Sequence, residues 1–359
     1  MIWLLSFSAN IAVTALTDSK EKLDSLIFFT SLSGGIAGAI GVVQMLLFRY
    51  SDSLRSMFNP FWHMLDNAVA KLCTEILLPE SIVENFQRTE FICIPHRASG
   101  TFTNPVFYAI FLVIVAPLAV HSIFFSDSRK KRITSLFCFI FSAAGIAVSY
   151  SRGPYLAFAL SFVILFFYGK KHILKLFSIA VAMISVVAVA GNDVLKRLLT
   201  IFSSDDISIN TRSDIWKACF DMLDGHWLFG YGTGVSNVRE QLHNTYSINQ
   251  PHAHNLFLEI LLENGIIGAL ILLSVFIFFF IRMIKLSKKG AFEKSIAVTC
   301  LSSVIGFCFC SMTDYPVYGI KPVFYFMLIL GIAESAYTLS TKPSDIPYTI
   351  KTKELTYER

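Results

Sequence analysis

Long apolar segments alternate with short charged segments along most of the chain. Most of the apolar segments run for roughly 18 to 22 residues, the length at which an α-helix crosses about 30 Å of hydrocarbon. A further segment, 2–16, is also apolar but short for a full crossing. The clearest predicted spans are 27–48, 106–125, 133–150, 155–168, 173–190, 256–281, 295–312 and 323–339. The pattern predicts an all-α polytopic integral membrane protein with about nine transmembrane helices.

The composition agrees with this pattern and excludes several classes of protein. The 359 residues are 54% hydrophobic and only 15% charged, whereas a soluble domain is roughly 25% charged. A soluble enzyme, a disordered chain and a fibrous chain are therefore excluded. The seven cysteines include no Cys-x-x-Cys pair, so neither a zinc site nor a disulfide scaffold is indicated. The net charge of +5 comes mainly from loops between apolar segments, so we expect no nucleic-acid partner.

Basic clusters predict which side of the membrane each loop occupies. They lie at 129–132, 170–175 and 282–294, each two crossings from the next. The positive-inside rule places these clusters on the cytoplasmic side, and the long loop between spans ending near 190 and starting near 256 then lies outside. The predicted organisation is 1–48 N-terminal spans, 49–105 an outer segment with an interfacial helix, 106–190 central spans, 191–255 the large outer loop, 256–339 C-terminal spans and 340–359 a cytoplasmic tail.

Two arginines are prominent on the predicted outer side. Arg152 lies in the short turn 151–154, where it either anchors a helix end at the lipid headgroups or faces a polar cavity in the bundle. Arg212 precedes an amphipathic stretch, and we expect Thr211 or Ser213 to cap that helix. A positive helix end does not stabilise an arginine, so Arg212 is either a solvated loop residue or binds an anion jointly with the helix end.

Two histidines precede the predicted span 256–281. His252 and His254 are two residues apart, a spacing that permits metal ligation, but no nearby cysteine or matching carboxylate set completes a site. The sequence therefore predicts no metal. A histidine at a helix entry on the outer face is suited to general acid or base work. The alternative is an interfacial histidine whose ring is simply hydrogen-bonded.

Three polar residues continue into the same predicted span. Asn255, Glu259 and Glu263 recur at four-residue intervals, which places them on one stripe of a helix. Two carboxylates so close to an apolar span are costly unless they face polar partners. We expect them to pair with the arginines or to orient His254.

The histidine segment resembles the O-antigen ligase family, which also includes O-antigen polymerases and bacterial O-oligosaccharyltransferases. His254 and Asn255 are followed, after nine residues, by Gly265 and Gly268. This spacing is similar to the family's His-Asn-x9-Gly-x-x-Gly signature at the end of its large periplasmic loop.

The resemblance extends over residues 97–339. Arg152, within Ser-Arg-Gly, is similar to the family arginine at an outer helix end, and Arg212 is similar to the arginine that opens the large loop. The segment that begins with Arg97 resembles a further family element. Family members usually have more spans upstream than the one or two predicted here.

The resemblance implies a glycosyltransferase in the bacterial inner membrane, with its active site facing the periplasm. It implies an O-antigen ligase of lipopolysaccharide biosynthesis, which uses no cofactor and transfers a glycan from undecaprenyl diphosphate to lipid A-core. Arg152 and Arg212 would hold the diphosphate, and His254 would take the proton of the acceptor hydroxyl or position it. The supporting residues at this site would be Asn255, Glu259, Arg97 and His252.

Two kinds of alternative stay open. An O-antigen or exopolysaccharide polymerase, or a protein O-oligosaccharyltransferase, belongs to the same superfamily and shares its motifs. A transporter of lipid-linked sugars belongs to another class, which places polar residues near the membrane midplane and often has repeated halves. In this chain the polar candidates gather at the outer end instead, which favours an enzyme.

Overall fold

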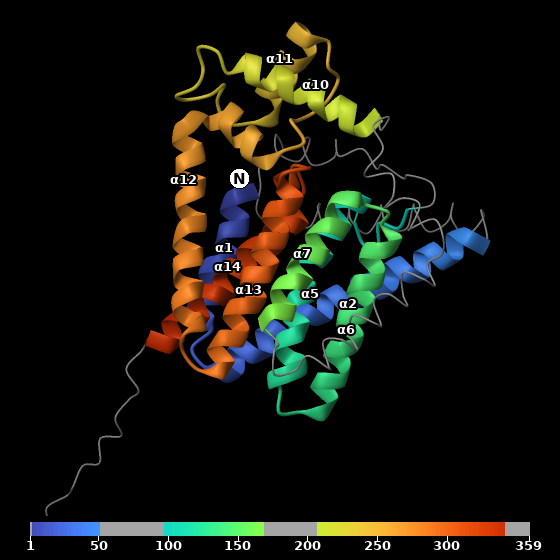
Figure 1. The fold of residues 1–359 in the computed structure, drawn as a ribbon, viewed down its shortest axis with the longest axis vertical. Helices are drawn as coiled ribbons and strands as arrows, with labels where there is room; N and C mark the ends of the chain where they lie inside the picture. The colour runs from blue at the N-terminus through green and yellow to red at the C-terminus, as the bar shows by residue number, and fades with distance from the viewer. Residues whose placement is uncertain (1, 51–96, 103, 169–206, 342–359) are drawn as a thin grey trace, which may run out of the picture.

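The computed structural model describes residues 2–50, 97–102, 104–168 and 207–341. Within these ranges the regular elements are all helical (Figure 1), which confirms the predicted all-α membrane fold. Among the described residues, six helices are long and apolar enough to cross a membrane, and two shorter apolar helices accompany them. The predicted span 173–190, nearly all of the segment predicted to hold an interfacial helix and most of the C-terminal tail lie outside the described residues.

The apolar helices form one bundle, and two further helices lie across one of its ends (Figure 1). The bundle consists of α1 (Ile2–Leu16), α2 (Lys20–Tyr50), α5 (Pro105–Phe125), α6 (Arg129–Val148), α7 (Arg152–Tyr168), α12 (Leu256–Ser287), α13 (Ala291–Ser311) and α14 (Ile320–Thr341). The two covering helices are α10 (Ile207–Met222) and α11 (Val235–Tyr246). We call the covered end the site end.

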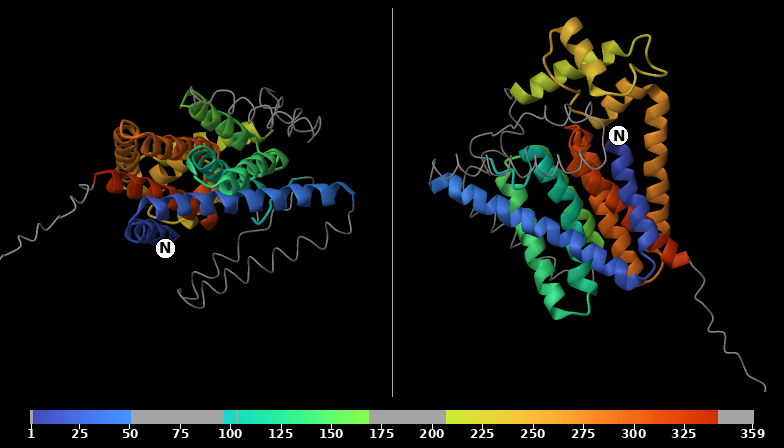
Figure 2. Two further views of the ribbon diagram at one scale, coloured as in Figure 1. Left: turned by 90° about the horizontal axis from the view of Figure 1, so that it is seen from below. Right: turned by 180° about the vertical axis from the view of Figure 1, so that it is seen from behind.

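Helix α5 forms the centre of the bundle. It is apolar around its whole circumference, as expected of a helix with no face toward water, and nearly all its residues from Pro105 to Ser122 are buried. Its neighbours are α2, α6, α7, α13 and α14. Figure 2 shows α2 crossing the bundle obliquely, and Gly38 lets it approach the backbone of α6 at Phe141 directly. Small residues at such a crossing allow the close packing typical of membrane helices.

The two covering helices are joined to the first part of α12 by a separate apolar cluster. This cluster includes Ile215 and Cys219 of α10, Leu242 of α11, and Leu258 and Leu262 of α12. Helix α12 thus packs against the covering helices with its first turns and then continues along the bundle.

The direction of α12 changes at Gly265. This glycine has φ 62° and ψ −165°, which lie outside helical values. A residue with a side chain rarely adopts a positive φ, so glycine is needed here. The bend separates a buried first part, which positions the site, from a second part that runs along the bundle.

Candidate active site

The turn before α12 holds His254 in an unusual backbone conformation. Its φ is +51°, in the left-handed region, which costs a residue with a side chain roughly 1–2 kcal/mol. The next residue, Asn255, caps α12 by accepting hydrogen bonds from the backbone N–H groups of Phe257 and Leu258, at 3.0 and 3.2 Å. The structure therefore assigns Asn255 a capping contact, and its side chain fixes where the helix begins.

Three further hydrogen bonds keep this turn in place. The Ala253 N–H donates to Glu259 Oε2 at 2.6 Å, and the Trp216 indole N–H of α10 donates to the Ala253 carbonyl at 2.9 Å. The His254 N–H donates to His252 Nδ1 at 3.1 Å. Strained residues persist only where their surroundings fix them, and Glu259, fully buried, is part of that support.

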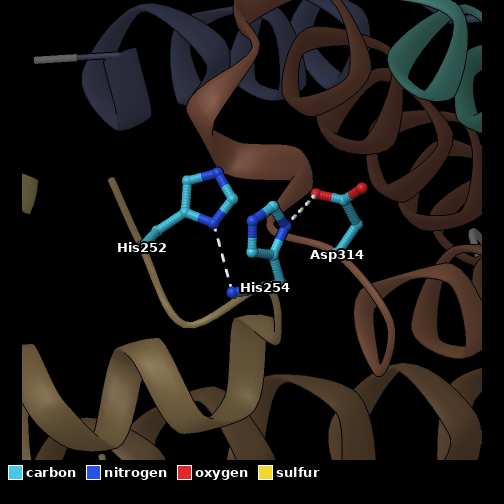
Figure 3. Close-up of side chains that lie close together, drawn as sticks. All are labelled: His252, His254 and Asp314. Atoms are coloured by element: carbon cyan, nitrogen blue, oxygen red, sulfur yellow. Dashed lines mark hydrogen bonds and ion pairs between the residues drawn. The ribbon is translucent and has the colours of Figure 1, made fainter. Parts of the chain in front are cut away.

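Asp314 faces the histidine from the other side of the site. It lies between α13 and the short 3₁₀ helix η3 (Pro316–Tyr318), and its Oδ1 is 3.6 Å from His254 Nδ1 (Figure 3). The same oxygen accepts a hydrogen bond from the Tyr315 N–H at 2.8 Å. Burial acts to raise the pKa of Asp314, but the neighbouring His254 outweighs that effect and lowers the pKa below its usual range. The carboxylate is therefore ionised at neutral pH.

His252 provides a neutral, buried support for the pair. Its ring is 4.3 Å from the His254 ring and packs against Tyr315 and Tyr318, with centroids 5.4 and 5.2 Å away. Burial lowers the pKa of His252 to about 3, and the charges of His254 and Arg212 act in the same direction. A ring that stays neutral, and whose Nδ1 already accepts the His254 N–H, is suited to positioning.

Arg212 lies in the second turn of α10. The helix begins at Ile207, so the prediction that Thr211 or Ser213 caps it is wrong, and with it the prediction that Arg212 lies at a positive helix end. Arg212 is half-buried, and its charge influences His252. Its positive charge therefore acts on the histidine site.

Arg152 is the first residue of α7 and is half-buried. A side-chain carbon on the adjacent Gly153 would lie 2.6 Å from Thr313 Oγ1. The start of α7 is thus packed directly against the residue that precedes Asp314. Arg152 is held at the same end of the bundle as the His254–Asp314 pair.

Arg97 supports the turn that leads to Arg152. Its Nε donates to the Ser149 carbonyl at 2.8 Å and its Nη2 to Ser151 Oγ at 2.6 Å. The neighbouring Ala98 N–H donates to the Val148 carbonyl at 3.0 Å. These contacts bind the segment 97–102 to the connection between α6 and α7.

Comparison with protein families finds a match for the central part of the chain. Residues 137–273 match a family model described as O-antigen ligase. Over this segment the chain is similar to the O-antigen ligase family. The predicted resemblance is confirmed, and the matched segment contains Arg152, Arg212 and His254. The search of curated proteins finds no match.

Asp314 lies outside the segment that matches the O-antigen ligase family, and the sequence interpretation did not include it. It is sixty residues from His254 and reaches the site only because α12 and α13 bring the two turns together. One signal was present: an acidic residue in the short connection 313–322 between two spans, where a charge is rarely found without a partner.

Asp314 also changes the argument about metals at this site. One potential ligand atom from each of His252, His254 and Asp314 lies within 4.8 Å of the others, and two imidazoles with one carboxylate are a common zinc ligand set. The sequence argument that no carboxylate set accompanies the histidines is therefore wrong. Metal-free chemistry stays a prediction. This prediction now rests on the contacts that the histidine nitrogens already make.

Proposed function

We propose that this protein is an O-antigen ligase that transfers a glycan from undecaprenyl diphosphate to lipid A-core oligosaccharide at the periplasmic face of the bacterial inner membrane. The observation that carries the proposal is the His254–Asp314 pair at one end of a membrane bundle, with Arg152 and Arg212 at the same end. His254 and both arginines fall within the segment that matches the family.

His254 acts as the general base in this proposal. Asp314 faces Nδ1, so a proton on Nδ1 points toward the carboxylate and Nε2 remains to accept another. Nε2 lies 3.3 Å from the side-chain amide of Gln250, and the acceptor hydroxyl takes the place of that amide as hydrogen-bond donor to the unprotonated Nε2. The imidazolium formed on proton transfer is stabilised by the Asp314 carboxylate, as in other histidine–carboxylate pairs. A base of this kind contributes about 10² to 10⁴ in rate.

The arginines act on the leaving group. As the acceptor oxygen bonds to the anomeric carbon, the bond from that carbon to the diphosphate oxygen breaks, and its electron pair leaves with the diphosphate. Guanidinium groups bind phosphate oxygens in pairs and stabilise the charge that develops there. The energy for transfer is stored in the donor, so no nucleotide is needed on the periplasmic side.

The reaction is metal-independent in this proposal. His252 Nδ1 accepts the backbone N–H of His254, so a metal ion at that nitrogen would have to displace a bond that supports the turn. Transfer should persist at full rate in a chelator such as EDTA. Loss of activity in EDTA with recovery on adding Zn²⁺ would instead assign His252, His254 and Asp314 as metal ligands.

The direct test is transfer by the purified protein in lipid, with glycan on undecaprenyl diphosphate as donor and lipid A-core as acceptor. We expect product from the unaltered chain and its near loss in His254→Ala. The matched control is His243→Ala, because His243 is an exposed histidine on α11.

Three outcomes would contradict a ligase. Glycan added to a second carrier-linked glycan identifies a polymerase, and glycan added to protein identifies an O-oligosaccharyltransferase. Movement of the donor across vesicle membranes without any transfer identifies a transporter.

A further inference from the structure

Three consecutive apolar side chains are exposed in the turn between α10 and α11. Trp227, Leu228 and Phe229 have 49, 53 and 70% of their surface accessible. Single exposed apolar residues are common, but a contiguous aromatic and aliphatic group marks an interaction site. This turn contributes nothing to the His254 site, so it calls for a separate explanation.

The turn is fixed rigidly to α12 at its bend. The Ile266 N–H donates to the Trp227 carbonyl at 2.8 Å, and the Tyr231 N–H donates to the Leu262 carbonyl at 2.7 Å. Gly265 approaches the Leu228 backbone so closely that a side-chain carbon would clash. The three exposed side chains are therefore held at the level of α12 where its second part begins.

The second part of α12 presents a long apolar surface. Only 17% of its most apolar stretch is buried inside the protein, and many side chains that follow the bend are exposed. These are Ile266, Ile267, Leu270, Ile271, Leu273, Val275, Ile277, Phe278, Ile281 and Ile284. In a multi-pass membrane protein such a surface faces lipid. The exposed turn begins where this lipid-facing surface begins and is bonded to its first residue.

We propose that Trp227, Leu228 and Phe229 insert into the lipid at the membrane–water boundary of the site end. Tryptophan is enriched at this depth because its ring is apolar while its N–H is polar. Insertion fixes α10, α11 and the His254 turn at a constant height above the membrane, since one hydrogen-bonded segment joins them to α12. The proposal concerns the loop and not the transfer reaction.

The test uses tryptophan fluorescence in vesicles that contain phosphatidylcholine brominated near the headgroup end of its acyl chains. The reference variant is Trp3→Phe/Trp62→Phe, which keeps Trp216 and Trp227. The comparison variant adds Trp227→Phe and keeps only Trp216, whose N–H bond to Ala253 is preserved. We expect strong quenching of the reference variant and loss of most of that quenching in the comparison variant.

Equal quenching of the two variants would overturn the proposal, because Trp227 would then be outside the lipid. Emission from Trp227 that is quenched by aqueous iodide and unaffected by brominated lipid would overturn it as well, and would leave another protein as the occupant of this surface. Both readouts are independent of glycan transfer, so failure here leaves the proposed ligase activity untouched, and failure of transfer leaves this result standing.

Discussion

Two histidine–aspartate pairs lie at opposite ends of α13, and both have a nitrogen–oxygen distance of 3.6 Å. His121 Nε2 faces Asp24 near Ser295, close to the start of α13, and His254 Nδ1 faces Asp314 just beyond its end. Distance alone does not distinguish them. Their surroundings do, and the difference shows which pair is suited to chemistry.

The His121 ring of the first pair is enclosed by protein. His121 is fully buried, its Nδ1 is 3.0 Å from Ser295 Oγ, and its ring packs against Phe125 and Phe292. Asp24 also contacts Lys131 Nζ at 3.3 Å. Because none of the His121 side chain is exposed, a substrate cannot reach its nitrogens. The pair joins α2, α5, α6 and α13.

The His254–Asp314 pair is open on one side. The His254 side chain is 25% exposed while Asp314 is 10% exposed, so the carboxylate is buried behind an accessible imidazole. His254 also has a strained backbone that several neighbours maintain. A histidine that is oriented on one side and accessible on the other is suited to proton transfer, whereas His121 is suited to holding helices together.

Substituting each histidine by alanine should give the largest difference between the two pairs. His254→Ala should lower the rate of transfer by about 10² to 10⁴ and change thermal stability little. His121→Ala should lower stability by on the order of 3 kcal/mol, because it removes a fully buried ring from the packed bundle, while the protein that remains folded keeps its turnover rate. Transfer assays and thermal unfolding in detergent on the same samples measure both effects. A fully active, well-folded His254→Ala protein would remove the basis of the comparison.

Substitutions of the two aspartates should likewise affect turnover in one pair and stability in the other. Asp314→Asn keeps the shape of the side chain and removes the charge that stabilises an imidazolium, so we expect turnover to fall by about 10² or more at nearly unchanged acceptor KM. Asp24→Asn should affect stability instead. If Asp314→Asn raised acceptor KM and left turnover intact, Asp314 would be a substrate-binding residue and not a positioning residue for His254.

Substitutions of the two arginines test whether the site end binds phosphate. Arg212→Ala and Arg152→Ala should each weaken donor binding by about ten- to a hundredfold, since a hydrogen bond to a charged group contributes about 1.5–3 kcal/mol. Lysine at either position should recover only part of the loss, because it lacks the paired donors. The donor concentration dependence of transfer measures the effect, and Arg239→Ala on α11 is an exposed control.

The lowered pKa of His252 predicts a smaller effect, which concerns how protein stability depends on pH. Its pKa is about 3 in the folded protein and 6.5 ordinarily, so between these values the unfolded chain binds a proton that the folded chain does not. Stability should therefore fall as pH decreases from 6.5, by up to about 1.4 kcal/mol per pH unit. His252→Gln should flatten this slope between pH 6.5 and 4.5. Melting temperatures across that interval measure it, and parallel slopes would contradict a neutral, buried His252.

Apolar segment length predicted the helices of the bundle well, because crossing a bilayer imposes a minimum run of apolar residues. The start of α10 was predicted too late. Thr211 and Ser213 are good capping residues, but the helix already includes both, because the local preference of a residue type does not decide where a helix begins. His254 was found from its spacing to Asn255 and the glycines. Asp314 was missed because a contact between turns sixty residues apart leaves no local pattern.

The most direct test of the central claim is the pH dependence of turnover at saturating donor and acceptor, compared between the unaltered protein and Asp314→Asn. If Asp314 orients the His254 imidazole and stabilises the imidazolium formed on proton transfer, maximal turnover of Asp314→Asn is lower by about 10² or more at every pH tested. Unchanged turnover in Asp314→Asn would contradict the account.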